Sequence, residues 1–423
     1  MDTIRRWTKD GTLSQVRELT DLTLVGNDVT VIVAPEIIAK FKTDMEKHNI
    51  TFKVISTDFK EVIDRSKLLN DVARKKGLAR RDNATARMRL RRRRKRQVYW
   101  WMGCKDIGTP DYYMTNDEMN HWLAHAARCS YRARLFSIGQ SYEGRQTLGI
   151  AVNEWKWNYP AIWINAGIHA REWISHSTAL YIIYRVLYGT DEDAIYLRNH
   201  YRWYIFPNLN PDGYDYTWTT DRLWRKTRSP TFNTTCYGVD VNRNFNFTWG
   251  RFMTSKHPCS DIYGGTGPFS EVETRNVRDA ILHLGKRLKI AIDLHSFAQL
   301  WLMPYGGSFR PPSDYPQMKS LANKAVEAIK NESGLIYKVG FPFQYLYPLS
   351  GSLMDWEKAS ANIKYPYNPE MRPNMTVGAE GFVPGPDQIV DAGREMFAAV
   401  TTICREVEKE LEPQLNNKIP SAG

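Results

Sequence analysis

The chain has 423 residues, of which 42% are hydrophobic and 13% aromatic, enough to fill the core of one large domain and one small one. This composition excludes a disordered or low-complexity protein, and the chain has no run of about 18 apolar residues that would form a membrane-spanning helix. The formal net charge is +12, but eight of these charges fall within residues 87–96, which leaves only +4 for the rest. A nucleic-acid-binding domain would spread its basic face over a folded surface. We therefore expect neither nucleic acid nor a membrane as a partner.

The first part of the chain is predicted to be a small α/β segment. Residues 29–33 (VTVIV) and 52–56 have the composition of strands, whereas residues 1–27 show no clear first strand or helix. Pro35, at a favoured first-turn position, opens a helical pattern that runs to Lys47. A second helix is predicted over residues 58–69.

A basic run follows this segment. Residues 70–96 lose apolar periodicity and become rich in arginine and lysine, which predicts a solvated, extended stretch. Such a stretch is an easy target for trypsin-like or basic-site proteases. A plain linker or a localisation signal is the alternative interpretation.

From residue 97 onward, strands and helices alternate. The strand predictions are residues 161–166 (AIWINA), 204–209 and 289–294 (KIAIDL). The helix predictions are residues 175–188, 271–285, 315–331 and 388–411. This alternation predicts an α/β fold with a largely parallel or mixed sheet covered by helices on both faces.

Two strand ends carry residues that bind metals. The strand at 161–166 is followed by a loop with His169 and Glu172, and the strand at 289–294 delivers His295. Ligand sites in α/β sheets lie beyond these carboxyl ends. Two histidines and one glutamate, with water in the fourth position, form a catalytic zinc site. The H-x-x-E pattern alone is weak, because a surface histidine beside a helix-starting glutamate has the same spacing.

Several longer motifs occur in one order along the chain. They are HAREW (169–173), NPDGY (210–214), LWRKTRS (223–229), GVDVNRNF (238–245) and DLHS (293–296). With these motifs the chain resembles the pancreatic-type zinc procarboxypeptidases of the A/B subfamily, closely over residues 97–410 and more loosely over 20–70. The resemblance implies a mixed central sheet flanked by helices in a catalytic domain at 97–423. It also implies a small α/β open-sandwich activation segment at 1–96, shortened here and ending in a polybasic cleavage linker.

The resemblance also implies an activity and its residues. The chain would be a monomeric, secreted zymogen that binds one Zn²⁺, hydrolyses the C-terminal peptide bond of peptides and is activated by a trypsin-like or basic-site protease. His169, Glu172 and His295 match the zinc ligands, and Asp240 matches the carboxylate behind His169. The other matches are Arg225 for the oxyanion, Asn242 and Arg243 for the terminal carboxylate, Arg171 and Phe297 for upstream substrate contacts, Tyr347 for closure over the substrate, and Glu370 as general base.

Each of these residues also has an ordinary interpretation. Arg225 stands among Arg222, Lys226 and Arg228, which together could form a solvated basic face. Tyr347 could be a loop aromatic, and Phe297 a core residue. The segment around Glu370 departs from the family pattern, because Pro369 removes an N–H and fixes φ immediately before it. The position of the Glu370 carboxylate is therefore in doubt.

Specificity depends on one position in the resembled family, the residue before the Asp355-Trp356 pair. B-type enzymes carry aspartate there and A-type enzymes an apolar residue; here it is Met354. Leu302 and Gly306 also match A-type positions, so we expect a preference for apolar or aromatic C-terminal residues. A B-type preference for basic residues, or a non-catalytic zinc- or peptide-binding relative, are the alternatives.

The cysteines and the N-terminal residues bear on whether the protein is extracellular. Cys236 and Cys259 could pair across a moderate loop, and the resemblance implies that they do; Cys104, Cys129 and Cys404 remain unassigned. The N-terminus shows no apolar signal-peptide core. The resemblance nevertheless implies an extracellular protein.

Overall fold

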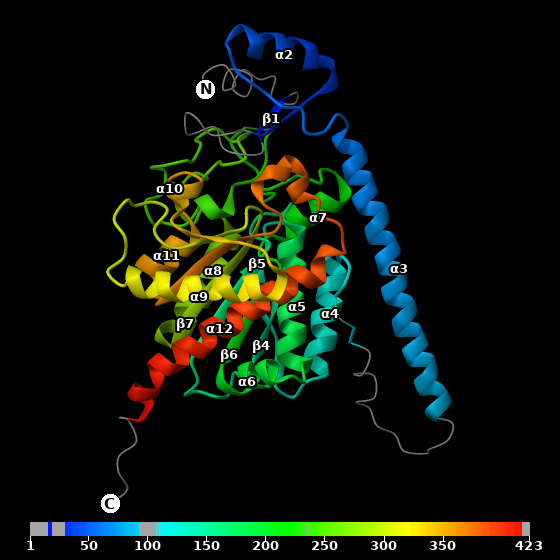
Figure 1. The fold of residues 1–423 in the computed structure, drawn as a ribbon, viewed down its shortest axis with the longest axis vertical. Coiled ribbons are helices and arrows are strands. Elements are labelled where there is room, and N and C mark those ends of the chain that lie inside the picture. The colour runs from blue at the N-terminus through cyan, green and yellow to red at the C-terminus, as the bar shows by residue number, and fades with distance from the viewer. Residues whose placement is uncertain (1–15, 19–29, 93–106, 109, 234, 417–423) are drawn as a thin grey trace, which may run out of the picture.

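The computed structural model describes residues 16–18, 30–92, 107–108, 110–233 and 235–416. A large α/β domain makes up the body of the molecule, and a smaller N-terminal segment lies at one end of it and continues as a long helix along its side (Figure 1). The predicted domain boundary after residue 96 lies outside the described residues.

An eight-stranded mixed sheet forms the centre of the large domain. Strands β6, β5, β7 and β10 are parallel neighbours, while β3 and β4 at one edge are antiparallel, and β8 is antiparallel to β10. From edge to edge the strands are β3 (Ala133–Gln140), β4 (Gln146–Val152), β6 (Arg202–Phe206), β5 (Ala161–Ala166), β7 (Leu288–Ser296), β10 (Tyr365–Met371), β8 (Leu300–Leu302) and β9 (Lys338–Gly340).

Helices cover both faces of this sheet, as predicted. One core packs the sheet against α4 (Asn116–Arg128), α5 (Trp173–Tyr188), α9 (Tyr315–Ser333) and α12 (Gln388–Asn416). The other packs it against α8 (Val272–Leu284) and α11 (Leu353–Ala359). The remaining elements are α6 (Glu192–His200), α7 (Pro211–Thr219), α10 (Pro342–Tyr345) and the 3₁₀ helices η3 (Val241–Arg243), η4 (Gly285–Arg287) and η5 (Met375–Phe382).

The N-terminal segment differs from its prediction in three ways. The strand β2 (Val31–Val33) pairs with β1 (Val16–Glu18), which the sequence reading did not identify, whereas residues 52–56 form no strand. The 3₁₀ turn η1 (Pro35–Ile37) and α2 (Ile38–Lys47) confirm the helical pattern. The second predicted helix, α3 (Phe59–Arg92), runs through much of the basic stretch that was predicted to be extended. Arginine, lysine and alanine favour helix strongly, and the stretch contains no proline, so helix propensity prevails over its polarity.

Two kinds of contact hold this segment on the large domain. Asn70 of α3 is buried, and its side-chain amide both donates to the carbonyl of Tyr113 and accepts from its N–H. One turn farther along α3, Arg74 forms an ion pair with Glu118 of the large domain. An apolar cluster, which we call the rim cluster, joins the two parts: it contains Ile32, Phe59, Val62 and Ile63 of the segment and Leu223, Phe297, Ala379, Phe382 and Val383 of the large domain.

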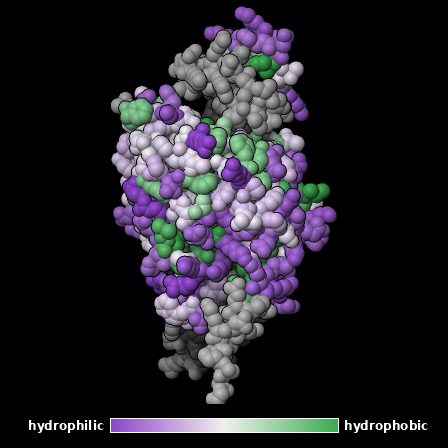
Figure 2. Space-filling view, turned by 90° about the vertical axis from the view of Figure 1, so that its left-hand side faces the viewer, coloured by the Kyte–Doolittle hydropathy of each residue, from purple (hydrophilic) through white to green (hydrophobic). Residues whose placement is uncertain are grey.

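A disulfide joins Cys236 and Cys259, which confirms their predicted pairing, and Cys404 is a buried free thiol. No described helix is both long and apolar enough to cross a membrane. On the face shown in Figure 2, hydrophobic residues form small separate groups among polar ones.

Candidate active site

Two neighbouring parallel strands bring the predicted metal ligands together. Strands β5 and β7 pair in parallel, so the loop after Ala166 and the end of β7 meet at the same edge of the sheet. The chain turns sharply at Gly167, where φ is +67° and an added Cβ would lie 2.3 Å from His176 Nε2. Only glycine fits this turn. It places His169 just before α5, with Glu172 as the residue that caps the helix.

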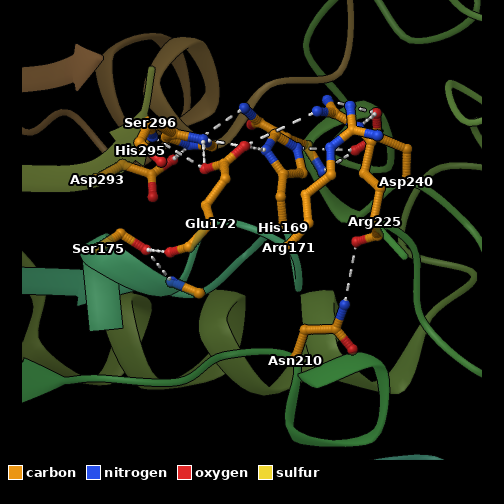
Figure 3. Close-up of polar contacts among 12 residues, drawn as sticks. His169, Arg171, Glu172, Ser175, Asn210, Arg225, Asp240, Asp293, His295 and Ser296 are labelled. Atoms are coloured by element: carbon orange, nitrogen blue, oxygen red, sulfur yellow. Dashed lines mark hydrogen bonds and ion pairs between the residues drawn. The ribbon is translucent and has the colours of Figure 1, made fainter. Parts of the chain in front are cut away.

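The three side chains point toward one another (Figure 3). His169 Nδ1 lies 2.8 Å from Glu172 Oε1, and His295 Nδ1 lies 3.1 Å from Glu172 Oε2. The two Nδ1 atoms are 3.1 Å apart. All three residues are buried. Among the described residues this is the single group of three or more such side chains that could hold a metal ion, and its two imidazoles and one carboxylate fit zinc.

A carboxylate stands behind each histidine. Asp240 Oδ1 lies 3.2 Å from His169 Nε2, as predicted, and Asp293 Oδ2 lies 2.8 Å from His295 Nε2. Asp293 was missed by the sequence reading. The available signal was its position two residues before His295, because alternate residues of a strand share one face. Both partners lie on the nitrogen that points away from the shared centre, so each can orient its imidazole.

These charges shift the pKa values of the cluster. Burial alone would raise the pKa of Glu172, but His169 and His295 outweigh it and the pKa falls below its usual value. Asp240 is likewise buried, yet the cations of Arg225 and Arg243 hold its pKa well below the ordinary range. Burial opposes the charged form of His295, but Asp293 and Glu172 raise its pKa well above normal.

Glu370 lies beside the metal cluster. Strand β10 runs parallel to β7, and their register pairs Glu370 with His295. The doubt raised by Pro369 is thereby removed, because the strand continues through the proline to Glu370. Burial raises the pKa of Glu370 to about 7, against the opposing effect of His295. A carboxyl group with this pKa can take up and release protons near neutrality.

Arg225 also reaches the cluster. Its Nε and Nη2 donate to Asp240 Oδ2 over 3.1 and 2.9 Å, and its Nη1 lies 4.0 Å from Glu172 Oε1. The alternative of a solvated basic face around it is wrong for two neighbours. Arg222 is buried and donates to the carbonyls of Arg171 and Phe382, and Lys226 is buried with its ammonium on the Pro258 carbonyl.

Asn242 and Arg243 lie on η3, next to these groups. The Asn242 amide oxygen accepts from the Leu353 N–H, which leaves its Nδ2 3.5 Å from His295 Nε2. Arg243 donates to the carbonyls of Met253 and Asn242, and its Nη2 lies 3.4 Å from the Tyr347 hydroxyl. The mobile tyrosine implied by the resemblance thus lies at the guanidinium implied to bind the terminal carboxylate.

Arg171 and Phe297, the residues implied to contact the substrate upstream of the scissile bond, both lie against Phe382. Arg171 donates to Asp261 over 3.0 Å, and its guanidinium lies 4.2 Å from the centre of the Phe382 ring. Phe297 packs edge-on against the same ring at 4.9 Å. Phe297 therefore belongs to the rim cluster, where the N-terminal segment packs, and Arg171 lies against Phe382 of the same cluster.

Met354 occupies an apolar surrounding. It is 1% exposed and packs with Ala298, Leu300 and Leu302. The neighbouring carboxylate of Asp355 accepts from the N–H groups of Gly306 and Gly307, and burial raises its pKa to about 7. Asp355 is thus held by the backbone next to Met354.

Comparison with known proteins identifies this arrangement. The sequence profile of the family described as "Zinc carboxypeptidase" matches residues 119–399, and that of "Carboxypeptidase activation peptide" matches residues 2–66. The chain is 39% identical over 300 residues to "Carboxypeptidase B" of Astacus astacus, a match that covers 70% of this chain and 97% of the relative. It is 32% identical to "Zinc carboxypeptidase A 1" of Anopheles gambiae, over 90% of this chain and 81% of the relative.

Two solved structures match nearly the whole chain. The crystal structure of thrombin activatable fibrinolysis inhibitor superposes with a TM-score of 0.80 at 27% identity, covering 96% of this chain and 95% of that one. Carboxypeptidase A from Helicoverpa armigera gives 0.79 at 26% identity, covering 96% and 94%. With the zinc-type ligand set at the strand ends, these matches place the chain in the zinc carboxypeptidase family, as a metallocarboxypeptidase that carries an activation peptide.

Proposed function

We propose that this enzyme releases single residues from the free C-termini of peptides and prefers apolar or aromatic ones. The observation that carries the proposal is the position of Asn242 and Arg243: Asn242 Nδ2 lies 3.5 Å from His295 Nε2, and Arg243 Nη1 lies 3.9 Å from Asp240 Oδ2. Met354 lies in an apolar surrounding. A site for a terminal carboxylate next to the metal defines which peptide bond is cut.

The side chains divide the chemistry of amide hydrolysis between them. When bound, zinc supplies a Lewis acid that acidifies a water molecule and polarises the scissile carbonyl. Glu370 takes the proton of that attacking water and passes it to the departing amine, for which its pKa near neutrality is suited. Arg225 donates to the oxyanion; loss of one such donor costs about 10²–10³ in rate.

The carboxylate site makes the reaction an exopeptidase reaction. A guanidinium and an amide match a planar carboxylate well. A peptide blocked as an amide, or an internal peptide bond, offers no terminal carboxylate to Asn242 and Arg243 and so forgoes the charge-assisted hydrogen bonds that a free C-terminus would make there. The proposal has Tyr347 close over the departing residue, and its hydroxyl lying 3.4 Å from Arg243 Nη2 supports this role.

Met354 supports the apolar preference. With Asp355 held by the Gly306 and Gly307 amides, a C-terminal lysine or arginine would bury its cation beside Met354 without a carboxylate. An apolar side chain would gain roughly 1.5–3 kcal/mol from burial. Methionine is bulky and adaptable, so the pocket should be shallow.

A B-type preference for basic residues is the second candidate, because one relative at 39% identity is named carboxypeptidase B. Matched peptides that end in Phe, Leu, Lys and Arg separate the two through kcat/KM, with C-terminal amides as the blocked control. The proposal expects Phe and Leu to exceed Lys and Arg and the amides to be resistant. A preference for Lys and Arg would select the second candidate, and no hydrolysis would indicate a non-catalytic relative.

We also propose that the activation segment restricts access to the site until it is cut in or after residues 91–96. Support comes from the rim cluster, in which four apolar residues of the segment pack against Phe297 and Phe382 beside Arg171. Basic side chains continue to the end of helix α3 and provide trypsin-like cleavage sites. Mild trypsin should raise the peptidase activity as the fragment that ends within residues 91–96 is released. A precursor as active as the trimmed enzyme would contradict the proposal.

An extracellular location is proposed as well. The Cys236–Cys259 disulfide supports it, since such bonds persist in oxidising compartments. The N-terminal sequence of the mature protein recovered from the medium of expressing cells would test both the location and the cleavage point near Gln97.

A further inference from the structure

The second carboxylate behind the metal ligands, that of Asp293, has a partner at each of its two oxygens. Its Oδ1 accepts from Asn165 Nδ2 of β5, and its Oδ2 faces His295 Nε2 at 2.8 Å. Its main-chain carbonyl lies 3.4 Å from the Asn368 amide of β10. Asp293 and His295 are both 0% exposed, so water does not weaken their interaction. Asn165 of the neighbouring strand β5 thus holds the carboxylate against the far nitrogen of a zinc ligand, while Asn368 of β10 contacts the main chain of Asp293.

The contacts of His295 select one arrangement of its protons. Asn242 is oriented by the Leu353 N–H, so its Nδ2 is a donor that faces His295 Nε2 from 3.5 Å. Asp293 approaches the same nitrogen to 2.8 Å and can only accept. The shorter contact requires a proton on Nε2. The lone pair of Nδ1 is then free to face Glu172 and His169, where the metal ligands converge.

We propose that Asp293 is a positioning residue that fixes His295 as a zinc ligand, in parallel with the role of Asp240 behind His169. It holds the ring in the orientation that directs Nδ1 to the metal and strengthens the imidazole as a ligand. The zinc site is thereby supported by two carboxylate–histidine pairs from different parts of the chain. The inference rests on the proposed role of His295 as a ligand.

Asparagine at position 293 removes this support without changing the size of the side chain. Asp293 accepts at both oxygens, whereas asparagine offers one, so its amide would face either Asn165 Nδ2 or His295 Nε2, donor against donor. Loss of such a partner typically weakens metal binding about 10–100-fold.

The test measures zinc release from the intact protein into excess chelator with a metal-sensitive dye. Asp293→Asn is expected to release zinc about 10–100-fold faster than the wild type. Glu357→Gln is the matched control. Glu357 is a buried carboxyl group that senses the charge of Asp293, and among the described residues it forms no side-chain hydrogen bond to a metal ligand. Its replacement should change the release rate less than about twofold. The melting temperatures of the zinc-free proteins show whether the fold itself has loosened.

Two results overturn the inference: release from Asp293→Asn within about twofold of the wild type, or equal acceleration in Asp293→Asn and Glu357→Gln. If Asp293→Asn does not fold, Asn165→Ala takes its place, since it leaves the Asp293 carboxylate but removes the hydrogen bond that Asn165 donates to it. Faster zinc release from that variant sustains the inference, and unchanged release overturns it. His295→Ala distinguishes a failure of the proposed ligand set from a failure of the proposed role of Asp293. Zinc retained at the wild-type rate in that variant would reject the proposed ligand set itself, whereas zinc lost there but held by Asp293→Asn rejects only the positioning role.

Discussion

Glu357 of α11 should destabilise the enzyme at neutral pH. The side chain is 0% exposed, and neither carboxyl oxygen has a hydrogen-bond partner among the residues that the structure describes. Burial and then the charge of Asp293 raise the pKa of Glu357 well above its ordinary value of 4.5. The folded protein therefore keeps the proton on Glu357 at pH values where the unfolded chain has lost it.

The sign of the effect follows from this difference in bound protons. The contribution of Glu357 to stability is complete below about pH 4.5 and is lost as the pH rises toward its folded-state pKa. Each pH unit in this window removes about 1.4 kcal/mol from the free energy of unfolding. Between pH 4.5 and 7.5 the upper bound is about 4 kcal/mol.

Glu357→Gln removes the titration and keeps the shape. At pH 7.5 the variant should be more stable than the wild type by about 1–4 kcal/mol, and at pH 4.5 the two should be nearly equal. Urea unfolding at both pH values, with the same free zinc concentration throughout, measures the difference. Other titrating groups are common to both proteins and cancel in the comparison.

Glu395 supplies the control, because its replacement by glutamine should lower the stability of the protein and not raise it. It is also 0% exposed, but its carboxylate receives hydrogen bonds from Arg372 and Tyr337. Glu395→Gln should therefore destabilise the protein, because it leaves the partly buried guanidinium of Arg372 with a weaker partner. If Glu357→Gln is less stable than the wild type at pH 7.5, or if its advantage does not depend on pH, the account of Glu357 as an unpaired buried acid is wrong.

Three further predictions concern the site. Glu370→Gln should keep its zinc but lose about 10²–10⁴ in kcat, because an amide cannot accept the proton of the water. Metal analysis and kinetics on one sample check this, and near-normal turnover would exclude Glu370 as the base. In the wild type, kcat/KM should fall on the acid side as Glu370 becomes protonated, with a midpoint below about 7 because bound zinc favours the carboxylate. Met354→Asp should shift kcat/KM toward peptides ending in Lys and Arg by at least about tenfold, since it places a carboxylate where the apolar side chain lay; an unchanged ratio would show that residue 354 does not line the pocket.

The sequence predicted the elements whose local pattern and tertiary surroundings agree. The run AIWINA is β5 with its predicted bounds, and α8, α9 and α12 begin within one residue of prediction. The strands β3, β4, β8, β9 and β10 were not predicted. Strand β10 contains Pro366 and Pro369, and its sequence does not read as a central strand. Pairing with β7 on one side and β8 on the other holds it in place.

His169, Glu172 and His295 could be proposed as metal ligands from their residue types and their places at strand ends. Asp240, Arg225 and Glu370 could be named only because the ordered motifs resemble those of the zinc carboxypeptidases. The sequence could not place them. That Glu370 lies beside His295 depends on the register of two strands 75 residues apart, and that Arg222 and Lys226 are buried depends on carbonyls supplied by distant segments.

Asp293 and Glu357 show the same limit most directly. In the sequence each is one acidic residue among many, and nothing local distinguishes the paired carboxylate from the unpaired one. Burial removes water from both side chains, and only the packing of strands β5, β7 and β10 and helix α11 decides which of them receives a hydrogen-bond partner. The sequence by itself determined the chemistry that this protein carries. The tertiary structure decided which charges are satisfied, because that depends on contacts between residues far apart in the chain.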